Sequence, residues 1–99
     1  MVHVIAVITA KPGKREELLG HFRANVAAVR AEQGCIEYGA AVDAPESQAK
    51  YGPDTIVIIE KWQSMEALQA HGRAPHMATW RANTKDLLAE RAVHILSPA

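Results

Sequence analysis

The chain has 99 residues, of which 48% are hydrophobic, and its 11 basic side chains balance its 11 acidic ones. This length predicts one domain over residues 1–99 with a hydrophobic core, and the absence of a basic stripe argues against nucleic-acid binding. The single cysteine, Cys35, excludes an internal disulfide and fits a reducing compartment. The first residues lack the basic segment of a signal peptide, and the apolar runs are shorter than the roughly 18 residues that cross a bilayer. We therefore expect a cytoplasmic protein without a membrane segment.

The period of the apolar pattern changes along the chain and predicts the order of the elements. Residues 2–10 are mostly apolar and β-branched and stop at a Pro-Gly pair, which predicts a strand. Residues 14–34 repeat apolar side chains every three or four positions, which predicts a helix of about five turns that ends at a glycine. Residues 35–42 predict a second strand, and a long connection follows over 44–54. The apolar stripe of the helix consists of Leu18, Phe22, Val26 and Val29.

The second half of the chain repeats the strand and helix signals. Residues 55–62 predict a third strand, and residues 64–68 a short helix capped by the serine at its start. Gly72 and Pro75 end this helix and start another, and residues 92–96 predict the last strand. The face of the later helix consists of Met77, Trp80, Thr84 and Leu87.

This β-α-β-β-α-β order predicts a ferredoxin-like α+β fold, in which helices cover one face of a four-stranded antiparallel sheet. A sheet with one solvated face alternates apolar and polar residues, yet residues 4–8 and 56–59 are apolar without a break. Because helices cover only one face, a monomer would leave a large apolar patch in water. We therefore expect a homodimer in which two sheets pack face to face.

Candidate catalytic groups gather where the third strand ends. Glu60, Trp62 and Ile58 share one side of this strand. If that side faces the helices, the carboxylate needs a partner or a raised pKa, and His71 or His76 is the expected partner. A Glu–His pair that only fixes a helix on the sheet is an equal alternative.

A histidine near its ordinary pKa of about 6.5 is suited to take a proton from a phenol at neutral pH. His71 and His76 are five residues apart, with Gly72 and Pro75 between them, so they do not share a helical face. Cys35 is a distant third ligand. We therefore expect general-base chemistry and no metal site.

The few aromatic side chains suggest a slot for a flat molecule. Trp62 and Trp80 are candidates for its walls, with Phe22 and Met77 nearby, and Tyr38 offers a hydroxyl. Filling the core is an alternative role for both tryptophans. No Gly-rich phosphate loop, nucleophile elbow or haem-attachment pattern occurs, so the sequence indicates no cofactor.

Several segments match one known family in order along nearly the whole chain. They include residues 10–14, residues 33–38 and residues 59–64, and they continue through His71 to residues 75–77. These segments resemble the antibiotic biosynthesis monooxygenase family, and within it the small bacterial quinol monooxygenases. The Glu-x-Trp…His…Pro-His run is the most specific part of the resemblance.

The resemblance implies a dimeric α+β barrel that oxidises quinols or anthrones with O₂, without metal, flavin or haem. Anthrone oxidation is in doubt, because Ile58 and Leu68 replace an asparagine before the tryptophan and a tyrosine after it. Haem degradation is not expected, because His71 and Arg81 replace that branch's tryptophan and haem-ligating histidine.

We therefore expect a cofactor-free quinol oxidase or monooxygenase that acts on a small aromatic with O₂. Two alternatives stay open: a non-catalytic stress protein that binds a quinone, and an isomerase or lyase that shuttles protons without O₂. The candidate catalytic residues are His71, His76 and Glu60. The candidate substrate-binding residues are Trp62, Tyr38, Phe22, Met77, Trp80 and Ile58.

Overall fold

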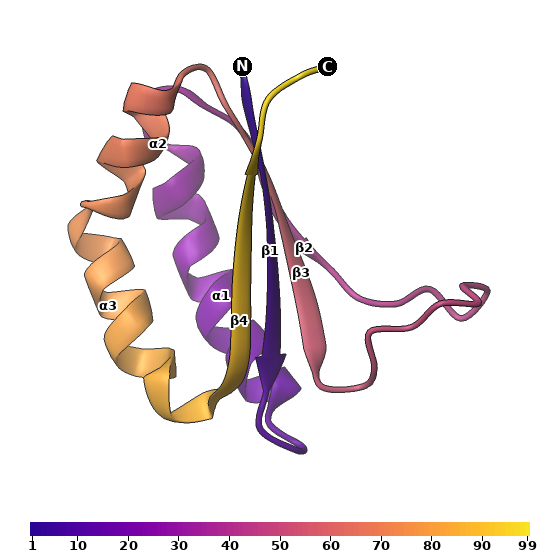
Figure 1. Ribbon diagram of the computed structural model, residues 1–99. Helices are drawn as coiled ribbons and strands as arrows, with labels where there is room; N and C mark the ends of the chain where they lie inside the picture. Colours follow the sequence, from indigo (N-terminus) through magenta and orange to yellow (C-terminus); the bar gives the residue numbers. More distant parts are fainter.

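A computed structural model describes all 99 residues and shows one four-stranded antiparallel sheet with strand order β2-β3-β1-β4. All three α-helices lie on one face of this sheet (Figure 1). The predicted ferredoxin-like α+β fold is thereby confirmed. The strands are β1 (Val2–Ala10), β2 (Cys35–Ala41), β3 (Thr55–Trp62) and β4 (Leu88–Leu96). The helices are α1 (Arg15–Arg30), α2 (Met65–Gly72) and α3 (Pro75–Thr84), and a short 3₁₀ turn covers Lys85–Leu87.

The core lies between α1 and the inner face of the sheet. Alternate residues of the central strand β1 are buried, as the period of two requires: Val4, Ala6 and Ile8 point inward. The predicted helical stripe faces this row. Leu18, Phe22 and Val29 are buried and Val26 packs partly buried beside them.

Two element boundaries differ from the sequence prediction. Helix α2 continues to Gly72, one turn beyond Leu68, and this carries His71 onto its last turn. Strand β4 begins at Leu88 rather than at residue 92, because pairing with β1 extends over the polar residues before the apolar run. Leu87 is buried as expected, but it lies in the 3₁₀ turn and not in α3.

Gly34 fixes the junction between α1 and β2. Its φ of 87° lies in the left-handed region, and a Cβ there would come within 2.6 Å of the Ala67 Cβ on α2. The Gln63 N–H also donates to the Gly34 carbonyl at 2.8 Å. Glycine is therefore required both by the turn and by the close approach of α2.

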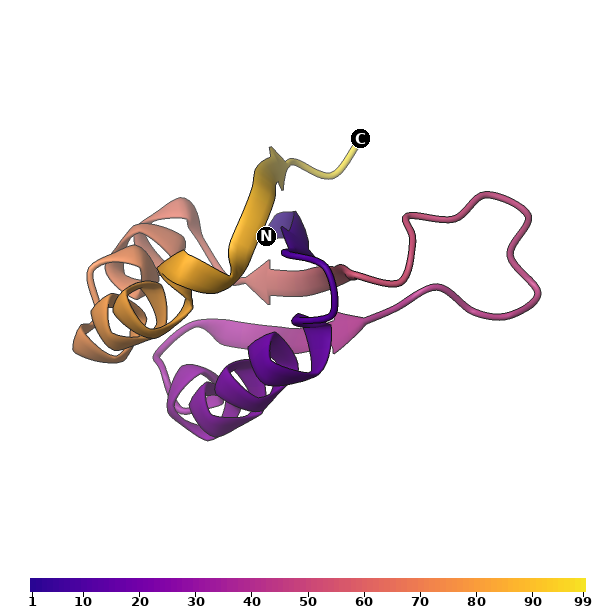
Figure 2. The ribbon, with the colours of Figure 1, turned by 90° about the horizontal axis from the view of Figure 1, so that it is seen from below.

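The other face of the sheet carries no helix (Figure 1). Its outward row includes Ile5, Val7, Val57 and Ile59, which are partly exposed. The connection over residues 42–54 extends far from the sheet, on the side opposite the helices (Figures 1 and 2). None of the helices combines the length and apolar character needed to cross a membrane.

Candidate functional site

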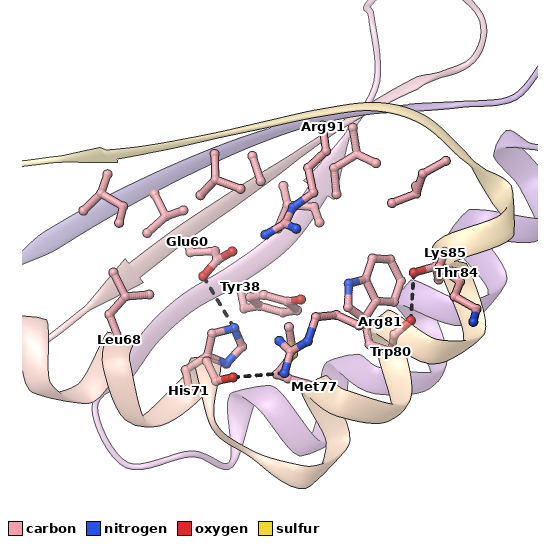
Figure 3. A pocket seen from close by; sticks show the side chains of 18 residues that line it. Tyr38, Glu60, Leu68, His71, Met77, Trp80, Arg81, Thr84, Lys85 and Arg91 are labelled. Atoms are coloured by element: carbon pink, nitrogen blue, oxygen red, sulfur yellow. Dashed lines mark hydrogen bonds and ion pairs between the residues drawn. The ribbon is translucent and has the colours of Figure 1, made fainter.

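A cavity of about 350 Å³ separates the inner face of the sheet from α2 and α3 (Figure 3). This volume falls within the range of small-molecule sites. Apolar side chains of the sheet form one wall, and His71 and Trp80 belong to the opposite, helical wall. The lining residues are Val4, Ala6, Ile8, Tyr38, Ile58, Glu60, Leu68, His71, Gly72, Met77, Trp80, Arg81, Thr84, Lys85, Leu88, Arg91, Val93 and Ile95.

His71 is held in place from two sides. Its Nδ1 lies 2.8 Å from Oε2 of Glu32, a hydrogen-bonding distance. Its ring packs against the buried Trp62 indole, with ring centroids 4.6 Å apart. The imidazole is only 5% exposed, and it contributes to the cavity wall. Glu32, in the turn after α1, and Trp62, at the end of β3, thus fix the orientation of this ring.

Glu60 lies beside His71, as predicted for its partner, at ion-pair distance but without a hydrogen bond. Its Oε1 lies 3.9 Å from His71 Nε2, beyond hydrogen-bonding distance, and instead accepts the Trp62 Nε1–H at 2.9 Å. Burial raises the pKa of the Glu60 carboxyl, and the negative charge of Glu32 raises it further. The Trp62 hydrogen bond and the charge of His71 act in the opposite direction on this pKa.

His76 lies on the far side of Glu32. Its Nε2 is 2.8 Å from the same Oε2 that contacts His71, and His76 does not line the cavity. The two histidines were predicted as alternative proton acceptors. The structure places only His71 where a molecule in the cavity would touch it.

Glu32, His71 and His76 are also the one group of side chains that could hold a metal ion, with ligand atoms within 4.8 Å of one another. The carboxylate of Glu32, not Cys35, completes this group. In a tetrahedral site with bonds of about 2.1 Å, ligand atoms lie about 3.4 Å apart. The observed N–O distances of 2.8 Å match hydrogen bonds instead.

The aromatic residues divide into those that line the cavity and those behind it. Tyr38 and Trp80 line it, whereas Phe22 lies behind them, stacked on Tyr38 at 5.1 Å and edge-on to Trp80 at 6.2 Å. Burial, with the charges of Glu60 and Glu32, raises the pKa of Tyr38, so its hydroxyl is neutral and available as a donor.

Trp62 was predicted as a wall of the cavity, but its side chain is fully buried and does not line it. The indole lies behind His71 and supports that ring. Ile58 and Met77 line the cavity as predicted.

The sequence did not single out Glu32 or the cavity arginines as candidates. Glu32 falls outside the apolar stripe of the helix predicted over residues 14–34, so it looks like a solvated residue, and in the structure it lies in the turn after α1. Arg81 and Arg91 line the cavity, but they are separated in sequence from the Glu-x-Trp…His run. Only the register of β4 shows that Arg91 belongs to the inner face of the sheet.

Comparisons with known proteins show which family and which solved structures the chain is similar to. The sequence profile of the family described as antibiotic biosynthesis monooxygenase matches residues 1–83. The Escherichia coli protein named probable quinol monooxygenase YgiN is 38% identical, over 99% of this chain and 98% of its own length. The crystal structure of PA3566 from Pseudomonas aeruginosa superposes with a TM-score of 0.85 at 31% identity, over 99% of this chain and 93% of that one. Rv0793 from Mycobacterium tuberculosis gives a TM-score of 0.84 at 31% identity, over 99% and 94% of the two chains.

Proposed function

Because the chain belongs to the antibiotic biosynthesis monooxygenase family, we propose that it oxidises a small, electron-rich aromatic of the quinol type with O₂. The family and its named relatives indicate a monooxygenase-type enzyme. The proposed oxidation of a quinol-type aromatic is supported by one observation above all. A buried histidine, anchored by a carboxylate on one nitrogen, lies against a largely apolar cavity of small-molecule size.

Proton transfer is the step for which these side chains are suited. In the neutral tautomer of His71 that donates its Nδ1–H to Glu32, Nε2 carries no proton and can accept one from a phenol. The carboxylate of Glu32 then stabilises the imidazolium that forms, as the acidic member of a catalytic triad does. Tyr38 supplies a neutral hydroxyl that can donate to a second oxygen of the substrate.

The electrons pass directly from the substrate to O₂ in this proposal. The phenolate transfers one electron to O₂, which gives a semiquinone and superoxide. Transfer of a second electron and both protons yields quinone and hydrogen peroxide. Recombination of the radical pair instead yields a hydroxyquinone and water. The protein contributes proton transfer, exclusion of water and a flat apolar slot, with no metal, flavin or haem in either route.

We further propose that the protein is a homodimer in which the uncovered sheet faces meet. The outward side chains of β1 and β3 include Ile5, Val7, Val57 and Ile59, and no helix covers them. Apolar faces of this kind mark interfaces in soluble proteins.

Oxygen uptake tests the proposed reaction. Menadiol is added without oxygen, air is then admitted, and uptake is compared with spontaneous oxidation. We expect uptake well above the spontaneous rate, unchanged by a chelator, and reduced about a hundredfold or more in His71→Ala. His21→Gln, a histidine of α1 outside the cavity, is the matched control and should keep the rate of the parent.

Two other outcomes would identify the alternatives. Binding of menadione without accelerated uptake would indicate a quinone-binding protein. Product formation before air is admitted would indicate an isomerase or lyase. A His71→Ala protein with full turnover would remove the base assignment, and loss of activity with chelator would indicate a metal at Glu32, His71 and His76.

A further inference from the structure

We propose that the cavity selects aromatic molecules that carry an anionic ring substituent, of the carboxylate type, and that Arg91 and Arg81 bind this group. The inference rests on the proposed function and specifies its substrate class. It starts from a charge imbalance in the cavity wall. Arg81, Lys85 and Arg91 line the cavity, whereas Glu60 is its only acidic lining residue.

The backbone register places Arg91 on the inner face of the sheet. Arg91 pairs with Ile8 in the β1–β4 ladder, and paired residues point to the same side. Ile8 is buried beneath the helical layer, so the arginine extends from a row that is otherwise apolar on both strands. Figure 3 shows its guanidinium reaching into the cavity above Tyr38. Arg91 is itself exposed, so its charge is reached from solvent as well as from the cavity that it lines.

The protein itself supplies no such charge. Of the five ion pairs in the structure, none involves Arg81, Lys85 or Arg91. Arg81 donates one N–H to the Gly72 carbonyl at 3.2 Å, and its other donors remain available. Glu60 accepts its hydrogen bond from Trp62 and lies beside His71. The arginines are therefore free to bind an anion that enters with a ligand.

A carboxylate on an aromatic ring fits this arrangement. A planar guanidinium binds a carboxylate through two parallel hydrogen bonds, and the apolar wall accommodates the ring. The phenolic hydroxyl would meet His71, while Arg91 reaches the cavity from the opposite, sheet side (Figure 3). This division leaves Arg91 to recognise a second, permanently charged group rather than the reacting oxygen, while Arg81 extends from the helical wall.

Binding of two redox-stable naphthalenes tests the inference without turnover. Calorimetric titration compares 6-hydroxy-2-naphthoate with 2-naphthol, which lacks the carboxylate. We expect the carboxylate to bind at least about fivefold more tightly, with a preference that shrinks as salt is raised. Arg91→Gln should remove most of the preference and Arg91→Lys should retain part of it. Arg23→Gln, on the exposed side of α1, is the control and should leave it intact.

Each contrary outcome overturns the inference in a distinct way. Equal affinity for both naphthalenes means that the cavity does not recognise the anion. If Arg91→Gln weakens both ligands equally, the arginine contacts the ring or the hydroxyl instead. Menadiol has no carboxylate, so its turnover tests the proposed oxidation independently of carboxylate recognition. Accelerated oxygen uptake with menadiol would uphold the quinol reaction even if carboxylate selection is lost. If neither naphthalene binds and menadiol is not turned over, both proposals fall.

Discussion

Two neighbours fix the orientation of His71, one by packing against its ring and one by a hydrogen bond. Trp62 supports the face of the ring, and its Nε1–H keeps Glu60 turned away from a direct hydrogen bond with the imidazole. Glu32 holds Nδ1 and shares the same oxygen with His76. One carboxylate oxygen therefore accepts two hydrogen bonds, which restricts its motion and that of both histidines.

Replacing Glu32 by glutamine tests whether this carboxylate acts through His71. The amide retains the size and one acceptor, but it cannot stabilise a positive imidazolium. We expect kcat to fall about ten- to a hundredfold while KM changes by less than about twofold. Glu37→Gln, which loses only the half-exposed pair with Lys61, is the control. Unchanged kcat in Glu32→Gln would show that the hydrogen bond is structural.

Tyr38 predicts a specific dependence of stability on pH. Burial raises the pKa of its phenol above the ordinary value of 10.0, so above that pH the unfolded chain releases a proton that the folded chain retains. The free energy of unfolding therefore decreases as pH rises above this value, by up to about 1.4 kcal/mol per pH unit. Tyr38→Phe keeps the ring and should show a shallower decline in denaturant titrations at alkaline pH. Parallel declines in the two proteins would contradict this prediction.

At the scale of the elements, the apolar periods predicted the strands and helices well because each follows from a local pattern. Short, unbroken apolar runs rich in β-branched residues mark β1 and β3, and the i, i+4 stripe marks α1, where burial on one face imposes the repeat. The first residues of β4 escaped prediction because their pairing with β1, not their composition, makes them a strand.

The candidate site was predicted less completely than the fold, for a related reason. His71 and Glu60 stand near one another in sequence, so their proximity could be anticipated. Glu32 is 39 residues from His71, and only the fold brings the turn after α1 beside the last turn of α2. A turn residue that looks solvated in the sequence becomes a partner when the fold brings two histidines beside it.

The turn at Gly34 is the element on which this packing depends. Gly34→Ala would place a Cβ 2.6 Å from that of Ala67 and force a left-handed φ on alanine. We expect a loss of about 2 kcal/mol or more in the free energy of unfolding, measured by denaturant titration. Gly20→Ala is the matched control, because its Cβ would meet nothing within 4 Å and helix α1 favours alanine. Equal stability of the two variants would show that the turn can adapt.

For the whole molecule, the two faces of the sheet differ in whether helices cover them. The inner face is covered by α1, α2 and α3, and the cavity lies within that layer. The outer face presents the apolar side chains of Ile5, Val7 and Ile59 without a helix. The cost of exposing such a surface scales with its apolar area, so association of two copies would stabilise the fold as well as the site.

Ile59→Lys tests this association directly. Ile59 lies on β3, beside Ile5 of β1, near the middle of the outer face. A lysine there would place two like charges in the interface of a symmetric pair, whereas the same residue remains solvated in a monomer. Sedimentation velocity should give the parent protein twice the chain mass of 10.8 kDa and the variant the mass of a single chain. Ala24→Lys adds the same charge to the exposed side of α1 and should leave the dimer intact. A parent protein that sediments as a monomer would contradict the proposed dimer. The cavity and its His71–Glu32 pair belong to one chain, so the proposed reaction would still be tested by turnover.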